Sequence, residues 1–168
     1  MTQLPLVIRP ENAGDADGVE RLHERAFGPG RFARTAYRIR EGAPHHRDLS
    51  FTALVGSLLV GSVRLTPVMA GNAPALMLGP LTVDPAFENR GIGRALIERA
   101  LDAALAAGHG LVLLVGDELY YSRFGFQRIP PGRFTMPGPV DPNRFLAAEL
   151  LEGAMAKAEG AVRPAPTA

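Results

Sequence analysis

The stretch LTVDPAFENRGIGRAL, residues 81–96, decides how this chain folds. An apolar run ends at Val83, a polar turn follows, and Gly91 and Gly93 stand where a long helical pattern begins. Glycine has no Cβ, so backbone N–H groups at these positions can approach a ligand closely. The unpaired amides of a first helical turn also favour an anion. The stretch therefore predicts a strand, a glycine loop and a helix N-terminus that together cradle a phosphate group.

A helix and a second buried strand follow this stretch. Apolar residues recur at helical spacing from Gly91 to about Ala107, and Gly108 ends the pattern. Residues 111–115 are wholly apolar, which is typical of a buried strand. Strand, helix and strand over about forty residues predict a parallel βαβ unit. Because ligands of open α/β sheets bind at the C-terminal ends of such strands, we expect the glycine loop and residues 116–121 to border one cleft.

The rest of the chain predicts a single domain over residues 1–168 with a flexible tail from about residue 160. His23 is expected to be solvated or half-buried on its helix. Further strands are expected at residues 6–9, 50–55, 58–69, 75–83 and 126–129, and helices at residues 15–27, 31–41 and 119–124. Residues 130–142 contain five prolines and predict a loop that could form a substrate lip. Arg31, Arg34 and Arg38 share one helix face, which is either solvated or a wall for an acidic group.

Composition excludes several classes of function. With 18 basic and 17 acidic side chains, the net charge of +1 gives no general attraction to nucleic acid or membrane. The chain has no cysteine, which excludes disulfides, thiolate zinc sites and a cysteine nucleophile. The adjacent His45 and His46 lack further ligands at suitable spacing, so no metal site is predicted. No signal peptide or membrane span is found, which predicts a cytoplasmic protein.

The glycine loop fits some phosphate ligands and not others. A Walker loop requires Gly-Lys-Ser/Thr, which is absent, and a dinucleotide fingerprint requires a small residue where Leu96 stands. The remaining ligand is a cofactor pyrophosphate held by backbone amides alone. The alternative is a helix that starts with glycines for packing reasons.

Two motifs at a fixed separation resemble those of the acetyl-CoA-dependent N-acetyltransferases of the GNAT superfamily. They are V-x-P-x5-G-x-G from Val83 and Y-x3-G-F from Tyr121, and the resemblance covers roughly residues 49–129. The ending, MPGPVDPNRFLAAELLEGAM, is similar to the bacterial YhbS-like branch. The resemblance implies a mixed α/β fold with a mostly antiparallel sheet, a central parallel strand pair and flanking helices. It also implies that RFLAAELL is a strand, although its composition favours a helix.

The resemblance further implies the site residues and a co-substrate, acetyl-CoA, without a metal. Backbone groups of Leu81 and Val83, with Thr82 between them, would pair with the pantetheine arm. The pyrophosphate would be held by the amides of Asn89, Arg90, Gly91, Ile92, Gly93 and Arg94. Tyr121 would stand near the cofactor sulfur. The chain departs from the family at Glu88, where Gln or Arg is usual; a carboxylate there repels a diphosphate unless it points away or pairs with Arg90.

The roles of several side chains have two interpretations. Tyr121 could protonate the leaving thiolate, or only pack under the cofactor. Asp117 and Glu118 could accept the amine proton, but Asp117 could equally cap a helix. Arg94 and Arg123 could pair with cofactor phosphates, or lie exposed.

The predicted function is transfer of an acetyl group from acetyl-CoA to a primary amine of a small molecule or peptide. The competing hypotheses are a non-catalytic acyl-CoA-binding regulatory module and an enzyme that acetylates proteins. A homodimer could form through the C-terminal strand.

Overall fold

The computed structural model describes residues 5–27 and 44–166. The predicted helix over residues 31–41, with the basic face of Arg31, Arg34 and Arg38, lies outside the described residues.

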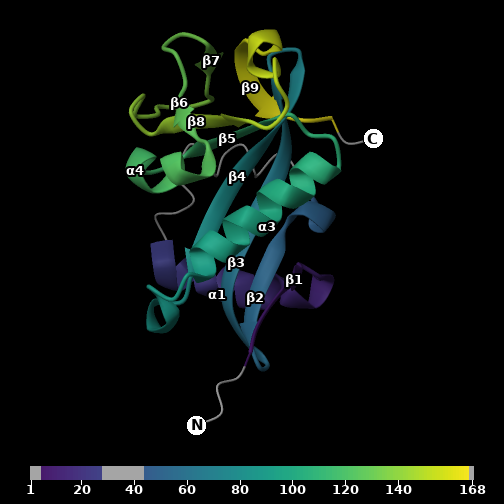
Figure 1. Cartoon of the computed structure of the whole chain (residues 1–168), viewed down its shortest axis with the longest axis vertical. Helices are drawn as coiled ribbons and strands as arrows, with labels where there is room; N and C mark the ends of the chain where they lie inside the picture. The colour runs from purple at the N-terminus through teal and green to yellow at the C-terminus, as the bar shows by residue number, and fades with distance from the viewer. Residues whose placement is uncertain (1–4, 28–43, 167–168) are drawn as a thin grey trace.

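A single mixed sheet forms the centre of the molecule (Figure 1). Its main path runs, in spatial order, through β1 (Leu6–Pro10), β2 (Phe51–Val55), β3 (Leu58–Ala70), β4 (Ala73–Val83), β5 (Leu111–Val115), β8 (Phe145–Glu149) and β6 (Gln127–Arg128). All neighbours on this path are antiparallel except β4 and β5, which are parallel. The fold class that the sequence predicted is therefore confirmed.

Helices cover both faces of the sheet. The helix α3 (Ile92–Ala106) lies in front of the strands in Figure 1, and α1 (Ala16–Phe27) passes behind them. A short helix, α4 (Glu118–Tyr121), follows β5. The 3-10 turns are η1 (Ala13–Asp15), η3 (Arg47–Leu49), η4 (Pro85–Phe87), η5 (Ser122–Phe124) and η6 (Met155–Lys157). Within residues 5–27 and 44–166, no helix is both long enough and apolar enough to cross a bilayer.

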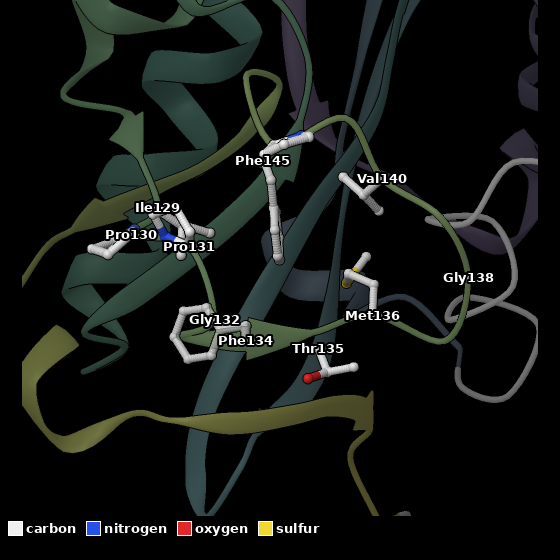
Figure 2. Close-up of a pocket in the computed structure, with 11 residues that line it drawn as sticks. Ile129, Pro130, Pro131, Gly132, Phe134, Thr135, Met136, Gly138, Val140 and Phe145 are labelled. Atoms are coloured by element: carbon white, nitrogen blue, oxygen red, sulfur yellow. The ribbon is translucent and has the colours of Figure 1, made fainter.

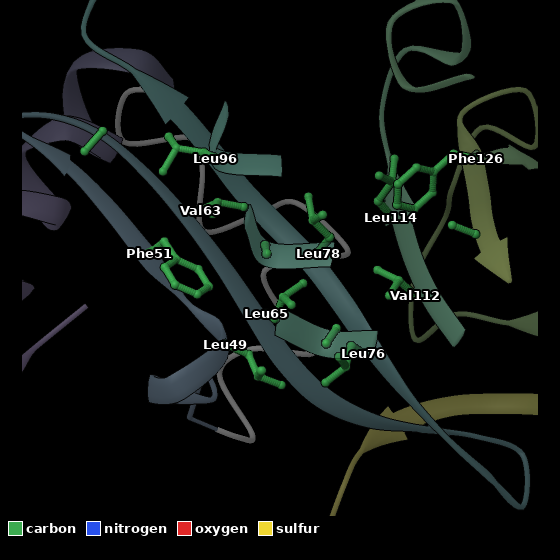
Figure 3. Close-up of a cluster of buried hydrophobic side chains, with 14 of the residues drawn as sticks. Leu49, Phe51, Val63, Leu65, Leu76, Leu78, Leu96, Val112, Leu114 and Phe126 are labelled. Carbon is green, nitrogen blue, oxygen red and sulfur yellow. The ribbon is translucent and has the colours of Figure 1, made fainter. Parts of the chain in front are cut away.

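Successive side chains of a strand point to opposite faces of the sheet, so the buried residues form two clusters. On the α3 side, Leu76 and Leu78 of β4 pack with Leu96 of α3 and Leu114 of β5 (Figure 3). The intervening residues, such as Met77, face the opposite cluster. Burying one such leucine contributes about 1.5–3 kcal/mol, so this layer fixes α3 against the sheet and with it the glycine loop.

The parallel pair β4–β5 is short. Its ladder contains only Leu76 with Val112 and Met77 with Leu113. Beyond it the two strands diverge (Figure 1), and β4 continues to Val83 paired on its β3 side. Gly79 and Pro80 are joined by a cis peptide bond, and the register of the β3–β4 ladder shifts opposite them, between Val63 and Leu65. A split therefore opens between β4 and β5 beside the start of α3.

The predicted C-terminal tail is wrong over its first residues. The strand β9 (Gly160–Pro164) pairs antiparallel with β3 and parallel with β7 (Phe134–Thr135), a short strand inside the proline-rich loop. Val162 is buried, and the Arg163 guanidinium donates to the carbonyl of Gly71 at 2.8 Å. A segment of five residues carries too little periodicity to reveal a strand whose partners are distant in sequence.

Two other expectations have clear outcomes. The segment RFLAAELL contains strand β8, as the family resemblance implied and local composition did not, because pairing with β5 and β6 outweighs helix propensity. His23 is not solvated: it is 1% exposed, on the face of α1 that packs against the sheet.

Candidate active site

The free edge of β4 is the first part of the site. Antiparallel partners alternate between residues that exchange hydrogen bonds and residues whose N–H and C=O groups point to the other edge. The Asp84 amide donates to the Val60 carbonyl at 2.8 Å. Thr82, two residues earlier and opposite Ser62, is therefore the next residue of β4 whose backbone N–H and C=O groups face β3. Val83 and Leu81 therefore direct their backbone groups away from β3, toward the split.

The side chains of this segment face two ways. Leu81 and Val83 pack against the core cluster on the α3 side. The Thr82 side chain, between them in sequence, is buried, and its hydroxyl finds no hydrogen-bond partner among the described residues. The same holds for the hydroxyl of Ser62, its cross-strand neighbour.

The glycine loop ends in a left-handed residue that starts α3. Gly91 is the N-cap with a φ of 79°, and Asn89 also has a positive φ of 62°. A Cβ on Gly91 would meet no atom within 4 Å, so the space beside this residue is open. The amides of Ile92, Gly93 and Arg94 belong to the first turn and have no partner within the helix. The buried side chain of Ile92 fixes this turn to the core, and the amides are suited to an anion.

Charged side chains surround the loop without filling it. The Arg90 guanidinium lies 5.3 Å from the centroid of the Phe87 ring, and Arg94 donates to Glu98 at 2.9 Å. Glu88 is exposed and, within the described residues, forms no ion pair with Arg90. The expected alternative of a Glu88–Arg90 pair is therefore wrong, because Arg90 stacks on an aromatic ring instead.

Tyr121 packs at the end of α4, on the β5 side of the split. A Cβ on Gly116 would lie 2.5 Å from Cε2 of Tyr121, so the ring position requires glycine there. Phe126 meets the ring edge-on at 5.9 Å between centroids. Burial raises the pKa of Tyr121 to about 12; Tyr120 adds to the increase, and Arg144 opposes it. The phenol therefore stays protonated and can donate a hydrogen bond.

Tyr120 is a further candidate site residue, which the sequence motifs did not indicate. Its hydroxyl lies 3.0 Å from the point that a Cβ on Gly93 would occupy, and side chains of Val83 and Leu81 lie 3.7 Å and 3.9 Å from the same point. Tyr120 thus reaches from α4 to the start of α3. Burial raises its pKa, and Arg123, which lies 5.3 Å from its ring centroid, opposes that increase. The signal was the pair of consecutive tyrosines, of which the Y-x3-G-F motif uses only the second.

The two carboxylates considered as bases are both engaged. Asp117 accepts a hydrogen bond from the Leu119 amide at 3.1 Å and caps α4. Glu118 accepts from Arg128 at 3.0 Å. The capping interpretation of Asp117 is therefore the observed one.

The two adjacent histidines have different surroundings: His45 belongs to an ion cluster around the buried Glu11, whereas the His46 ring lies 6.3 Å from that of His109 between centroids. His45 lies 3.0 Å from a carboxylate oxygen of Glu11, which also accepts two hydrogen bonds from Arg64 at 2.9 Å and 3.0 Å. Burial alone would raise the pKa of Glu11, but the hydrogen bonds from His45 and Arg64 lower it to about 2. Over residues 5–27 and 44–166, no group of three or more histidine, aspartate or glutamate side chains is arranged to hold a metal ion.

Comparison with known proteins agrees with this arrangement. Residues 47–128 match the model of the acetyltransferase (GNAT) domain. The chain is 28% identical over 159 residues to the uncharacterized N-acetyltransferase YhbS of Escherichia coli strain K12, covering 94% of this chain and 95% of that protein. It is also 28% identical over 148 residues to YjhQ of the same strain, covering 85% and 81%.

Two solved structures are similar to the whole fold. Escherichia coli YhbS in complex with CoA superposes with a TM-score of 0.82 at 26% identity, over 98% of this chain and 92% of that one. A GNAT acetyltransferase from Brucella melitensis in complex with acetyl-CoA gives a TM-score of 0.63 at 29% identity, over 87% and 97%. The split sheet, the glycine loop and the tyrosine motif agree with these matches, and residues 47–128 form an N-acetyltransferase domain of the GNAT superfamily.

Proposed function

We propose that this protein transfers an acetyl group from acetyl-CoA to a primary amine. The observation that supports this most is the set of backbone groups of Leu81 and Val83 that point into the split, next to the first-turn amides of α3. The pantetheine arm carries amide groups of its own, so it can pair with β4 as a strand would. The pyrophosphate then reaches the amides from Asn89 to Arg94. The similar proteins crystallised with CoA and acetyl-CoA support the same assignment.

Acetyl transfer requires a neutral amine, an oxyanion site and a proton for sulfur. The amine nitrogen attacks the thioester carbonyl carbon, the C–N bond forms, the C–S bond breaks, and the amine proton leaves to a base or to solvent. Of the two N–H groups that face the split, those of Leu81 and Val83, one can stabilise the charge that develops on the carbonyl oxygen while the other pairs with the pantetheine arm.

Tyr121 acts on the leaving sulfur as a hydrogen-bond donor. A thiol of pKa about 8.5 and a phenol of pKa about 12 differ by about 3.5 units, so complete proton transfer from Tyr121 to the thiolate costs on the order of 5 kcal/mol. A hydrogen bond from the neutral phenol avoids this cost and still stabilises the departing thiolate. Solvent then supplies the final proton.

Cofactor binding is the first test of this function. At 100 times its dissociation constant, CoA should stabilise the fold by about 2.7 kcal/mol. For a chain of this size this raises the melting temperature by about 5–10 °C. An unchanged melting temperature at millimolar CoA contradicts the proposal.

Turnover separates an enzyme from a non-catalytic acyl-CoA-binding module. Free thiol should be released from acetyl-CoA when amino acids, polyamines, aminoglycosides or short peptides are supplied as acceptors. Stabilisation by CoA without thiol release in any of these classes favours the binding module.

A further inference from the structure

A half-open cavity of about 260 Å³, lined mainly by apolar side chains, lies under the proline-rich loop of residues 130–142. Its lining residues include Ile129, Phe134, Met136, Val140 and Phe145; in Figure 2, Phe145 lies between Ile129 and Phe134 on one side and Met136 and Val140 on the other. The volume is somewhat below the roughly 300–1,000 Å³ of pockets that enclose whole drug-sized ligands. The cavity therefore suits one apolar group of a larger molecule.

The loop that forms this cavity is held from both sides. The Ile129 amide donates to the Phe145 carbonyl at 3.1 Å, which closes the loop at its base. The Arg133 side chain donates to the carbonyls of Met155 and Ala158, both at 2.6 Å. These bonds, with the β7–β9 pairing, make the cavity preformed, so little ordering free energy opposes the entry of a ligand.

One wall of the cavity lies at the C-terminal end of β5, the strand that borders the split. Phe145 is the cross-strand partner of Val115, the last residue of β5, and the Gly116 amide donates to the Arg144 carbonyl at 2.9 Å. The charge of Arg144 also acts on the Tyr121 hydroxyl. Phe145, a residue of the cavity wall, directly follows Arg144 in the sequence. The positive charge of Arg144 lowers the pKa of the Tyr121 phenol.

The cavity and the glycine loop lie on opposite faces of the sheet. Phe134 and Phe145 belong to the core cluster opposite α3, whereas Leu96 and Tyr121 pack on the α3 side. A cofactor whose pyrophosphate binds at α3 enters the split from the α3 side. A group in the cavity therefore approaches from the other face, as part of the second substrate.

We propose that this cavity binds an apolar side chain of the acceptor, so that the preferred acceptors are primary amines with an aliphatic or aromatic substituent close to the nitrogen. This inference rests on the proposed acetyl transfer and specifies its acceptor class. Both free amines and peptide N-termini present this chemistry.

Matched acceptors test the proposal. Glycinamide, leucinamide and phenylalaninamide share the same amine and differ in the side chain alone. We expect kcat/KM with acetyl-CoA to be about ten- to hundredfold higher for the two apolar amides, because an apolar side chain is buried only for them. Val140→Asp should remove this preference, and Leu58→Asp, the same kind of change at an exposed position outside the cavity, should keep it.

The outcomes distinguish this proposal from the proposed function. Equal kcat/KM for the three amides overturns the cavity assignment while acetyl transfer stands. If no amide is acetylated, calorimetric titration of each amide into the protein with saturating CoA tests the cavity assignment directly. Equal affinities for the three amides overturn the assignment. If CoA itself fails to bind, the proposed function fails first.

A second arm separates the acceptor from the acyl donor. Hexanoyl-CoA and acetyl-CoA are compared with glycinamide as acceptor, in the wild type and in Val140→Asp. We expect the variant to affect both donors equally. A selective loss with hexanoyl-CoA would assign the cavity to the acyl chain and overturn the proposal.

Discussion

The Tyr120 hydroxyl lies 3.0 Å from the position of a Cβ on Gly93, so a residue of α4 closes against the first turn of α3. Tyr120 and Tyr121 meet edge-on, with ring centroids 5.0 Å apart. The two phenols are neighbours in sequence but have different surroundings. Tyr120 reaches toward the glycine loop, whereas Tyr121 packs against Gly116 and Phe126.

Tyr121→Phe should bind CoA normally and transfer acetyl about ten- to a hundredfold more slowly. The variant loses one hydrogen bond to the leaving sulfur and keeps the ring packing. Single-turnover thiol release measures the rate, and a CoA titration measures binding. A rate equal to that of the wild type would remove Tyr121 from the mechanism.

Tyr120→Phe is the matched variant and should have a different effect. Its hydroxyl faces the start of α3, so we expect the affinity for CoA to change by several-fold while kcat stays within about twofold. Steady-state kinetics with varied acetyl-CoA separates KM from kcat. A large fall in kcat here, with none in Tyr121→Phe, would exchange the roles of the two tyrosines.

Gly116→Ala should reproduce the kinetic effect of Tyr121→Phe without touching the phenol chemically. The new Cβ would lie 2.5 Å from the Tyr121 ring and must displace it. We expect thiol release to slow by tenfold or more while CoA still raises the melting temperature. Gly14→Ala is the control, because its Cβ would meet only one neighbouring atom, at 3.4 Å, an ordinary contact.

Gly91→Val should abolish stabilisation by CoA. The side chain would occupy the open space beside the first-turn amides, where the pyrophosphate is proposed to bind. Gly108→Val is the control, since Gly108 also has a positive φ and open space around its Cβ position but lies at the other end of α3. Both variants should lose about 1–2 kcal/mol from backbone strain. Only Gly91→Val should lose the CoA-induced rise in melting temperature.

Acid should destabilise the fold through Glu11. Its pKa is about 2 in the folded protein and 4.5 in the reference state, so the stabilisation is complete above about pH 5 and is lost as the pH falls toward 2. The difference corresponds to about 3 kcal/mol. Urea unfolding from pH 7 to pH 2.5 measures it, and Glu11→Gln should be less stable at pH 7 and show a smaller decline. An equal decline in both proteins would contradict this role.

The central part of the fold was predictable because it is local. Gly91 and Gly93 mark the loop, the apolar stripe that includes Leu96 marks α3, and residues 111–115 mark the next strand. Each signal is contained in a few consecutive residues. The family resemblance then supplied the mostly antiparallel sheet with its central parallel pair, and it identified the segment of β8 as a strand although its Ala and Leu content suggests a helix.

What the sequence did not reveal depends on distant partners. Val162 is buried only because β9 meets β3 and β7, and nothing in GAVRP indicates this. The burial of His23 depends on how α1 lies on the sheet. The reach of Tyr120 toward Gly93 depends on the angle at which α4 leaves β5, which a motif does not encode. Glu88 remains unusual for the family. Because its side chain is exposed, its charge stays solvated.

The pairing of β7 with β9 also has a practical consequence for handling the protein. A deletion that begins before Gly160 removes a strand that pairs with the loop around the cavity proposed to bind the acceptor, and a fusion partner attached directly after Pro164 would start close to that loop. Affinity tags for acceptor screening therefore belong at the N-terminal end. A C-terminally tagged preparation that binds CoA but discriminates poorly between amines would reflect the tag and not the enzyme.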